Sequence, residues 1–361
     1  MPTGARVALI RTTPDTVLQD YERLMDLADF RVQLDPSVTT VLRDCILWHF
    51  PFPSVNTTPW QLEGVARALR GAGYAHLVCV QDRPVIANPL KGEDLNAHTP
   101  IVRTYQIPLR FIGGASETRR VGYEPRGPML ALDRVSNQAI QLPACLSGTN
   151  IVFLPTLRCD AQTTIAGAVR IAADGLLGVR RYAAGPRIHE LLVDLLTIQK
   201  EIHASLFAVM DGTTAGNGPG PWAIAPEVKN VILASADLVA LDAVAARLMG
   251  FDPLRDVRYI RLAHERGLGL GDVRAIALVG DADLANERWS FSAGGCRWPR
   301  VLEPARELLQ RAPLLDGLIG SLEEYRAYYR WPARSRRVFE SWLRGTRWGK
   351  LFQEYSGGFK K

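Results

Sequence analysis

The sequence predicts an α/β protein with a mostly parallel sheet and crossover helices, on three observations. Short apolar runs alternate with segments of helical periodicity along much of the chain, which is typical of βαβ units. Hydrophobic residues make up 47% and charged residues 22% of the chain, so a sizeable core can form. The length of 361 residues allows one large domain or two smaller ones. Strands are predicted at Arg6–Arg11, Cys45–His49, Leu77–Gln81, Asn150–Leu154, Leu206–Met210, Val231–Ala234 and Ala275–Val279.

The strongest helix prediction starts at Thr58. Thr58 can cap the helix, Pro59 can occupy its first position, and Gln61 stands where a capping box requires it. This helix should end at Gly71 or Gly73, because glycine adopts the left-handed conformation that terminates helices. Apolar residues at helical spacing predict two further helices, over His189–His203 and Asp237–Gly250.

The predicted organisation is an α/β domain over residues 1–290 and a basic, aromatic C-terminal extension over 291–361. Residues 83–148 interrupt the α/β rhythm, because they are rich in Pro, Gly and Arg, and they are predicted to form a β-rich insertion or cap. Residues 297–361 contain 14 Lys and Arg against 7 Asp and Glu, whereas the whole chain has a net charge of +6. All of the surplus positive charge therefore lies in the extension, and the overall charge does not predict nucleic-acid binding.

Cysteine usage and hydropathy exclude several classes of protein. The five cysteines form no C-x-x-C pair, which argues against a disulfide framework, a zinc ribbon or an iron–sulfur cluster. The six histidines show no metal-ligand spacing, so no metal ligand is assigned and the cofactor is unknown. Without a run of eighteen apolar residues or an N-terminal signal-peptide pattern, we expect a cytoplasmic protein.

A glycine-rich stretch, predicted to be an active-site or ligand loop, follows the predicted strand Leu206–Met210 and is the first candidate site. Asp211 should lie at the carboxyl end of that strand, where open α/β sheets bind ligands, and it is a catalytic candidate. The alternative is a tight loop in which Asp211 organises hydrogen bonds. Asp211→Asn should abolish activity with the fold intact in the first case and unfold the protein in the second. Glycines let backbone N–H groups approach an anion, and the substrate-binding candidates here are Gly212, Gly216, Asn217 and Gly218.

Asp242 is the second catalytic candidate, because its neighbours at helical spacing are all apolar. A carboxyl group in such surroundings needs a partner from another element or has a raised pKa, and either is a hint of function. Arg247, His189 or a backbone amide of the glycine-rich stretch could be that partner. His189 opens a predicted helix, and it is both a plausible general base and a plausible structural residue.

Arginines after the predicted strand Asn150–Leu154 are the third candidate. Arg158 and Arg170 supply guanidinium groups suited to carboxylate or phosphate recognition. The alternative is that they are ordinary solvated residues. In the functional interpretation these arginines hold an anionic substrate while Asp211 or Asp242 moves a proton.

These features together resemble the family known as domain of unknown function 362, mainly over residues 150–281. The matching motifs are the Asp-Gly of the glycine-rich stretch with its Gly-x-Gly-Pro, then Leu-Ala-Ser-x-Asp-x-Val-Ala-x-Asp-Ala-Val-Ala, Met-Gly-Phe-Asp-Pro, and Gly-Leu-Gly before a final Val-Gly-Asp. The Thr57–Pro59 helix start adds a weaker match. Where the family commonly has Pro-x-x-Lys-x-His, this chain reads Pro155-Thr156-Leu157-Arg158-Cys159-Asp160. The positive charge is kept, but the lysine that could act as a nucleophile or proton carrier is not.

The resemblance implies a small-molecule enzyme or ligand-binding protein without naming a reaction. Our first hypothesis is an enzyme of small-molecule metabolism that acts on a carboxylate- or phosphate-bearing substrate by carboxylate acid/base chemistry. The alternatives are a non-catalytic protein that binds a partner or a membrane surface, and a factor that delivers a metal or cofactor to another enzyme. Whether the protein is an enzyme is left open at this stage.

The basic, aromatic tail is the second candidate for a binding function. Residues 325–361 contain 10 basic, 2 acidic and 10 aromatic residues. A helix over Ala333–Arg344 would align Val338, Phe339, Trp342 and Leu343 on one side. This pattern suits an anionic membrane surface or an acidic protein partner, whereas nucleic acid is unlikely because no recognised module accompanies it. The alternative is that the aromatic residues dock on the chain's own domain.

Overall fold

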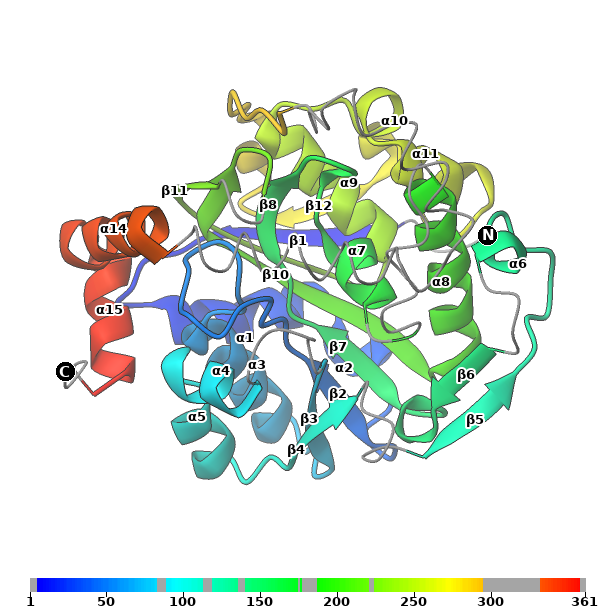
Figure 1. The fold of residues 1–361 in the computed structure, drawn as a ribbon, viewed down its shortest axis with the longest axis horizontal. Helices are drawn as coiled ribbons and strands as arrows, with labels where there is room; N and C mark the ends of the chain where they lie inside the picture. The colour runs from blue at the N-terminus through cyan, green and yellow to red at the C-terminus, as the bar shows by residue number, and fades with distance from the viewer. Residues whose placement is uncertain are drawn as a thin grey trace.

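A computed structural model describes residues 5–82, 89–112, 119–135, 140–174, 176, 187–220, 224–294 and 332–357. Its centre is a mostly parallel sheet (Figure 1), so the predicted α/β class is confirmed. The strands of its main path are, in spatial order, β12 (Ala277–Gly280), β1 (Arg6–Arg11), β11 (Ala225–Ser235), β10 (Ser205–Asn217), β7 (Asn150–Phe153), β2 (Thr40–Arg43), β3 (Leu77–Asp82) and β4 (Leu109–Ile112). Off this path, β8 (Thr156–Asp160) pairs with β10 and with β9 (Thr164–Ile165).

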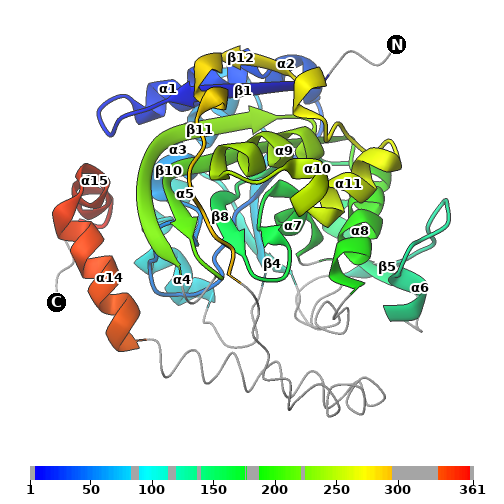
Figure 2. The same cartoon turned by 90° about the horizontal axis from the view of Figure 1, so that it is seen from above.

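Helices cover both faces of the sheet (Figures 1 and 2) and create two cores. In β1, Val7 and Leu9 point into one core and Ala8 and Ile10 into the other. Burial on both faces explains why these strands are continuous apolar runs. The first face carries α7 (Ala168–Ala173), α8 (Ile188–Ile202), α9 (Leu238–Met249) and α11 (Arg258–Glu265). The second carries α1 (Val17–Leu27), α2 (Phe30–Gln33), α3 (Pro59–Gly71) and α5 (Thr99–Thr104).

The predicted helix boundaries are confirmed to within one residue. The Thr58 hydroxyl accepts a hydrogen bond from the Gln61 N–H, and the Gln61 side chain completes the capping box. α9 begins after Asp237, whose carboxylate accepts hydrogen bonds from two first-turn N–H groups, and it ends at Gly250 with φ +98°. Local capping chemistry therefore decides where these helices start and stop.

The strand predicted at Cys45–His49 is wrong. The strand between β7 and β3 is Thr40–Arg43, and the chain then leaves the sheet in an irregular loop that leads to α3. Side chains of the loop hold its backbone: the Thr57 hydroxyl accepts from the Cys45 N–H, and the Asn56 side-chain oxygen Oδ1 accepts from the Leu47 N–H. An apolar run is compatible with a buried loop as well as with a strand.

The loop predicted directly after Asp211 is also wrong, because β10 continues to Asn217. β10 pairs with β11 in antiparallel fashion, with a register shift between Gly212 and Thr214. A Cβ atom at Gly212 would lie 2.9 Å from Val231 Cγ2, and one at Gly216 would lie 2.8 Å from Arg158 Cβ. The glycines therefore allow neighbouring strands to approach closely, and they do not form a free loop at this point.

The interval predicted as a β-rich insertion, residues 83–148, mixes helices and strands in its described part. After α4 (Pro89–Leu95) and α5, β4 pairs in parallel with β3 and extends the main sheet. A separate two-stranded antiparallel sheet follows, formed by β5 (Arg120–Tyr123) and β6 (Ile140–Pro143). Other short elements are α6 (Leu132–Val135), η1 (Ala144–Leu146), α10 (Pro253–Asp256), η3 (Val273–Ala275) and η4 (Ala282–Asn286).

The C-terminal helices α14 (Pro332–Gly345) and α15 (Arg347–Tyr355) dock on the domain itself. Trp348 is buried against Trp60, with ring centroids 5.1 Å apart, and its Nε1–H donates to Asn230 Oδ1 at 2.7 Å. Trp342 is also buried and donates to the Thr214 hydroxyl at 3.2 Å. Self-docking of the aromatic residues is therefore confirmed for residues 332–357, and the rest of the 325–361 tail lies outside the described residues. None of the helices in the described ranges combines the length and apolar character needed to cross a bilayer.

Candidate functional site at the carboxyl edge of the parallel strands

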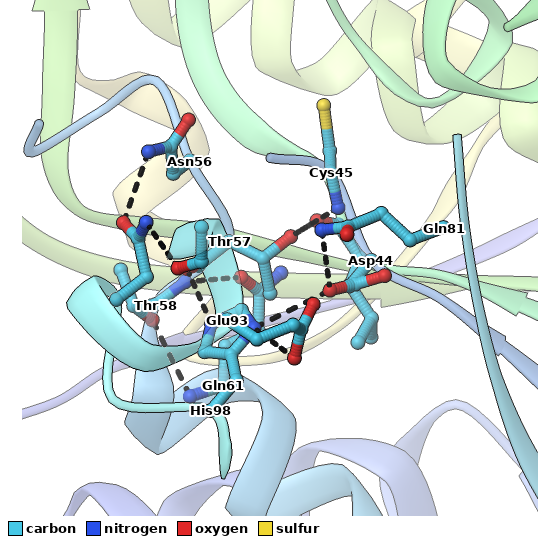
Figure 3. A network of polar contacts seen from close by, with 12 residues as sticks. Asp44, Cys45, Asn56, Thr57, Thr58, Gln61, Gln81, Glu93 and His98 are labelled. Carbon is cyan, nitrogen blue, oxygen red and sulfur yellow. Dashed lines mark hydrogen bonds and ion pairs between the residues drawn. The ribbon is translucent and has the colours of Figure 1, made fainter. Parts of the chain in front are cut away.

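A buried cluster of acidic and histidine side chains lies at the carboxyl ends of β2 and β3. Asp44 follows β2 directly, Glu93 comes from α4, and His98 precedes the first residue of α5. These three side chains point toward one another (Figure 3), and each is at most 2% exposed. Ligands of open α/β sheets bind at this edge, so the position marks a candidate site.

Hydrogen bonding fixes the orientation of the His98 ring. Its Nε2 lies 3.0 Å from the carbonyl oxygen of Thr57, which can only accept, so Nε2 carries the proton. Its Nδ1 lies 3.3 Å from Asp44 Oδ2 and 3.8 Å from Glu93 Oε2. In neutral His98 the Nδ1 lone pair therefore faces two carboxyl groups.

Several buried acceptors of this cluster have no hydrogen-bond donor among the described residues. They are Asp44 Oδ1, both carboxyl oxygens of Glu93, and the carbonyl oxygen of the Gln81 side chain. Gln81 Nε2 donates to Asp44 Oδ2 at 3.4 Å, which leaves its own oxygen without a donor. Burial, and then the charge of Asp44, raises the pKa of Glu93 well above its ordinary value. Unsatisfied buried polar groups are rare and require an explanation.

A buried arginine lies at the same edge of the sheet. Arg158 on β8 is 6% exposed, and its Nε has no partner among the described residues. Burial lowers the pKa of Arg158, whereas the nearby Cys45, Asp160 and Asp174 raise it. Burial raises the pKa of Cys45 to about 12, although the Arg158 charge opposes this rise. Cys45 is therefore a neutral thiol that follows Asp44 in the chain and lies near Arg158.

Asp211, a predicted catalytic residue, is fully buried and accepts hydrogen bonds on both oxygens. Its Oδ2 accepts from Tyr21, Thr58 and Trp60, each at 2.8 Å. Its Oδ1 accepts from the N–H and the hydroxyl of Thr213. Burial raises the pKa of Asp211, and these hydrogen bonds oppose the rise. The contacts favour the alternative in which Asp211 organises hydrogen bonds, and its catalytic role stays a prediction.

Asp242, the other predicted catalytic carboxylate, joins α9 to the start of α7. Its oxygens accept from the N–H groups of Ala168 and Val169 at 2.6 and 3.1 Å, and from the Tyr259 hydroxyl at 2.9 Å. A Cβ atom on Gly167 would lie 2.1 Å from Asp242 Oδ1, so only glycine fits there. Burial raises the pKa of Asp242 to about 7. The expected partner from another element is therefore found, and it is a helix N-terminus.

The remaining predicted site residues lie in several different places and do not form one cluster with each other. His189 stacks on Tyr259, with ring centroids 6.3 Å apart, so it lies on the Asp242 side; burial and Arg258 lower its pKa. Arg170 pairs with Asp174 at 2.7 Å. Gly212 and Gly216 pack against strands β11 and β8, Asn217 bonds to Glu227 and Ser292, and Gly218 adopts φ +126°. Asp211 and Asp242 share no hydrogen-bond partner among the described residues.

Sequence reasoning missed the cluster of Asp44, Glu93, His98 and Gln81. Asp44 directly follows β2, a short segment that starts with the β-branched residues Thr40 and Val41. This was the available signal, but the misplaced strand at Cys45–His49 concealed it. Glu93 and His98 lie in the interval that was predicted to be β-rich. Their six-residue segment begins in one helix and ends at the next, so no helical period links them.

The fold and the site define an α/β protein with a polar cluster at the carboxyl edge of its sheet. A family model described as domain of unknown function (DUF362) matches residues 46–247. This match covers more than half of the chain, so the chain belongs to that family, and the predicted resemblance is confirmed. The matched range contains Glu93, His98 and Arg158 and starts just after Asp44.

One curated relative gives a second, more distant similarity. The chain is 24% identical over 282 residues to the thylakoid-associated protein sll1697 of Synechocystis sp., which covers 76% of this chain and 78% of that protein. No solved structure matches the chain.

Proposed function

We propose that this protein is an enzyme of small-molecule metabolism that acts on a carboxylate- or phosphate-bearing substrate at the carboxyl edge of β2 and β3. The observation that carries the proposal is the buried group of Asp44, Glu93 and His98, in which three of the four carboxyl oxygens have no hydrogen-bond donor among the described residues. Acid/base catalysis commonly uses carboxylate and imidazole groups. Here His98 Nδ1 lies within hydrogen-bonding distance of Asp44 Oδ2, at 3.3 Å. In a purely structural cluster most buried acceptors have donors.

Arg158 is the residue that we propose holds the anionic group of the substrate. It is buried, and its Nε, which has no partner among the described residues, is a donor that a carboxylate or phosphate could use. A planar guanidinium binds such groups through paired hydrogen bonds, and burial strengthens the interaction. Arg170 is engaged with Asp174, so Arg158 is the better candidate of the two predicted arginines.

Thermal-shift screening with small carboxylates and phosphates tests the proposal, because any ligand that binds the folded state raises its apparent stability. A compound that stabilises the wild type should bind Arg158→Met at least about tenfold more weakly, which corresponds to about 1.4 kcal/mol. Arg158→Lys keeps the charge but not the planar fork, so it should show an intermediate loss.

Arg247→Met is the matched control, because Arg247 also has an Nε without a partner among the described residues. It lines a different cavity of about 550 Å³ together with Arg255, Arg274 and Arg288. Loss of binding in Arg247→Met with full binding in Arg158→Met would move the anion site to that cavity and contradict the proposal. No stabilising compound in a broad screen would count against a small anionic substrate altogether.

A second candidate function is binding of an anionic membrane surface or an acidic protein partner through the tail. The aromatic residues of α14 and α15 are occupied by the core, but Arg336, Arg337, Arg344, Arg347 and Lys350 are exposed. The similar Synechocystis protein is named as thylakoid-associated, which favours a membrane surface. Co-sedimentation with anionic vesicles should then occur at low salt and disappear at high salt, because the attraction is electrostatic.

We also propose a cytoplasmic location. The four cysteines in the described ranges are free thiols, which fits a reducing compartment. Fractionation of cells that produce the protein would test this directly.

A further inference from the structure

Three side chains of the edge cluster bring metal-ligating atoms together in the protein interior. One carboxylate oxygen from each of Asp44 and Glu93 and one ring nitrogen of His98 all lie within 4.8 Å of one another. Two atoms bonded to one transition-metal ion at about 2.1 Å can be at most about 4.2 Å apart. The pairs measured from His98 Nδ1, 3.3 Å and 3.8 Å, already satisfy that limit.

The orientation of His98 is the one that a metal ligand requires. Its Nε2–H donates to the Thr57 carbonyl, so the Nδ1 lone pair points at the two carboxyl groups. Metal-binding histidines almost always donate their second N–H to a carbonyl or carboxylate, which fixes the ring. Thr57 is itself fixed, because its N–H donates to the Cys45 carbonyl and its hydroxyl donates to the Leu154 carbonyl.

Gln81 provides an observation independent of these three residues. It is 1% exposed, it comes from β3, and its side-chain oxygen has no donor among the described residues although its Nε2 contacts Asp44. Figure 3 shows its side chain beside Asp44. The cluster therefore contains four buried oxygen atoms that have no donor within the described part of the chain, and one of them is the amide oxygen of the neutral Gln81.

No single hydrogen-bond donor could satisfy all of these oxygens. One donor serves one or two acceptors, and each buried polar group that is left without a partner costs about 1–3 kcal/mol. A divalent cation is attracted by several oxygens at once and neutralises two carboxylates in a low-dielectric interior. One imidazole with two carboxylates and an amide oxygen is a donor set for first-row transition metals, whereas Mg²⁺ and Ca²⁺ prefer oxygen ligands alone.

We propose that Asp44, Glu93 and His98 bind one divalent first-row transition-metal ion, such as Mn²⁺ or Zn²⁺, and that the Gln81 amide turns over so that its oxygen becomes an additional ligand. The proposal concerns the same edge of the sheet as the proposed function and deepens it, since a bound cation would attract an anionic group of a substrate. It does not depend on the identity of that substrate. A metal-binding measurement without any substrate therefore separates failure of this proposal from failure of the enzymatic one.

The test uses the full-length protein, produced in medium supplemented with Mn²⁺ or Zn²⁺ and then dialysed against metal-free buffer. We expect one retained ion per chain by elemental analysis, and loss of the aqueous Mn²⁺ electron paramagnetic resonance signal on titration of metal-stripped protein. His98→Gln and Glu93→Gln should each weaken Mn²⁺ binding by at least about 100-fold, because even outer-shell changes cost 10–100-fold.

His203→Gln is the matched control, because His203 is also buried and also has a ring nitrogen without a partner among the described residues, but it lies at Thr149. It should bind the metal as the wild type does. Wild-type protein that retains neither ion and shows no Mn²⁺ binding would overturn the proposal. So would a His98→Gln variant that keeps wild-type affinity. If His98→Gln does not fold, Glu93→Gln and the melting temperature of the wild type with and without Mn²⁺ decide the question, and an unchanged melting temperature counts against a site.

Discussion

Two groups of buried carboxylates in this protein differ in whether their oxygens have donors. Asp211 receives five hydrogen bonds from α1, α3 and its own strand, and Asp242 receives three from α7 and α11. Asp44 and Glu93 instead have oxygens without donors among the described residues, and both lie near Nδ1 of His98. The first group connects distant elements by hydrogen bonds, whereas the second has oxygen atoms that are available to bind a ligand.

Asp194 shows that the first group is a repeated structural device. This buried α8 residue accepts hydrogen bonds from the N–H groups of Leu130, Ala131 and Leu132, so it holds the start of α6 as Asp242 holds the start of α7. A carboxylate is stabilised at a helix N-terminus by its free N–H groups and dipole. Burial of a carboxylate alone therefore does not indicate function, and the state of its oxygens is the more informative property.

The largest expected effect is that of Asp211→Asn. An asparagine side chain has only one acceptor oxygen. Its NH₂ group would replace either Oδ1, which has two donors, or Oδ2, which has three, and those buried donors would lose their acceptor. We expect a loss of about 3 kcal/mol or more in the free energy of unfolding, measured by urea denaturation. Asp160→Asn, a change at a half-buried carboxylate on β8 that bonds within its own turn, is the control and should cost less. A stable Asp211→Asn variant that has lost only ligand binding would place Asp211 with the second group.

Much of the fold could be predicted from the sequence because its signals are local. The capping box at Thr58 and the Asp237 to Gly250 boundaries concern neighbouring residues only. Apolar runs located six of the seven predicted strands, but at Cys45–His49 the same run packs as a loop. The glycines after Asp211 suggested a loop. They are instead needed because strands β8 and β11 pack closely against β10, and this packing is not visible in the sequence.

The candidate site could not be predicted, because it depends on contacts between distant parts of the chain. Asp44 lies about fifty residues before Glu93 and His98, and only the parallel pairing of β2 with β3 and the packing of α4 and α5 bring them together. Asp242 was correctly expected to need a partner from another element. The sequence did not show that this partner would be a helix N-terminus and not a substrate.

A smaller effect is expected at Asp242, and it should depend on pH. Burial raises the pKa of its carboxyl group in the folded state to about 7, whereas an unfolded aspartate has a pKa of about 3.9. The folded state therefore holds a proton that the unfolded state releases between these values, so the free energy of unfolding should decrease as pH rises from about 4 to 7. Above the folded pKa this contribution is lost.

Asp242→Asn isolates this contribution from other titrating groups such as His189. The substitution should cost about 1–2 kcal/mol at pH 5, as loss of a helix cap does, and the difference from wild type should shrink toward pH 8. Urea denaturation of both proteins at each pH measures it. A difference that does not change with pH would mean that Asp242 is ionised throughout, and that its three hydrogen bonds outweigh its burial.

The smallest effect on stability is expected for Glu93→Gln in metal-free buffer, and this result bears most directly on the comparison. Neither carboxyl oxygen of Glu93 has a donor within hydrogen-bonding distance among the described residues, and glutamine has almost the same shape but cannot ionise beside Asp44. Replacing this buried carboxyl group by a neutral amide should change the free energy of unfolding by less than about 1 kcal/mol, or increase it. In the presence of Mn²⁺ the wild type should gain stability that the variant does not, since only a protein that binds the ion is stabilised by it. A loss of about 3 kcal/mol without metal would show that Glu93 is a structural tie like Asp211, and the distinction between the two groups of carboxylates would fail.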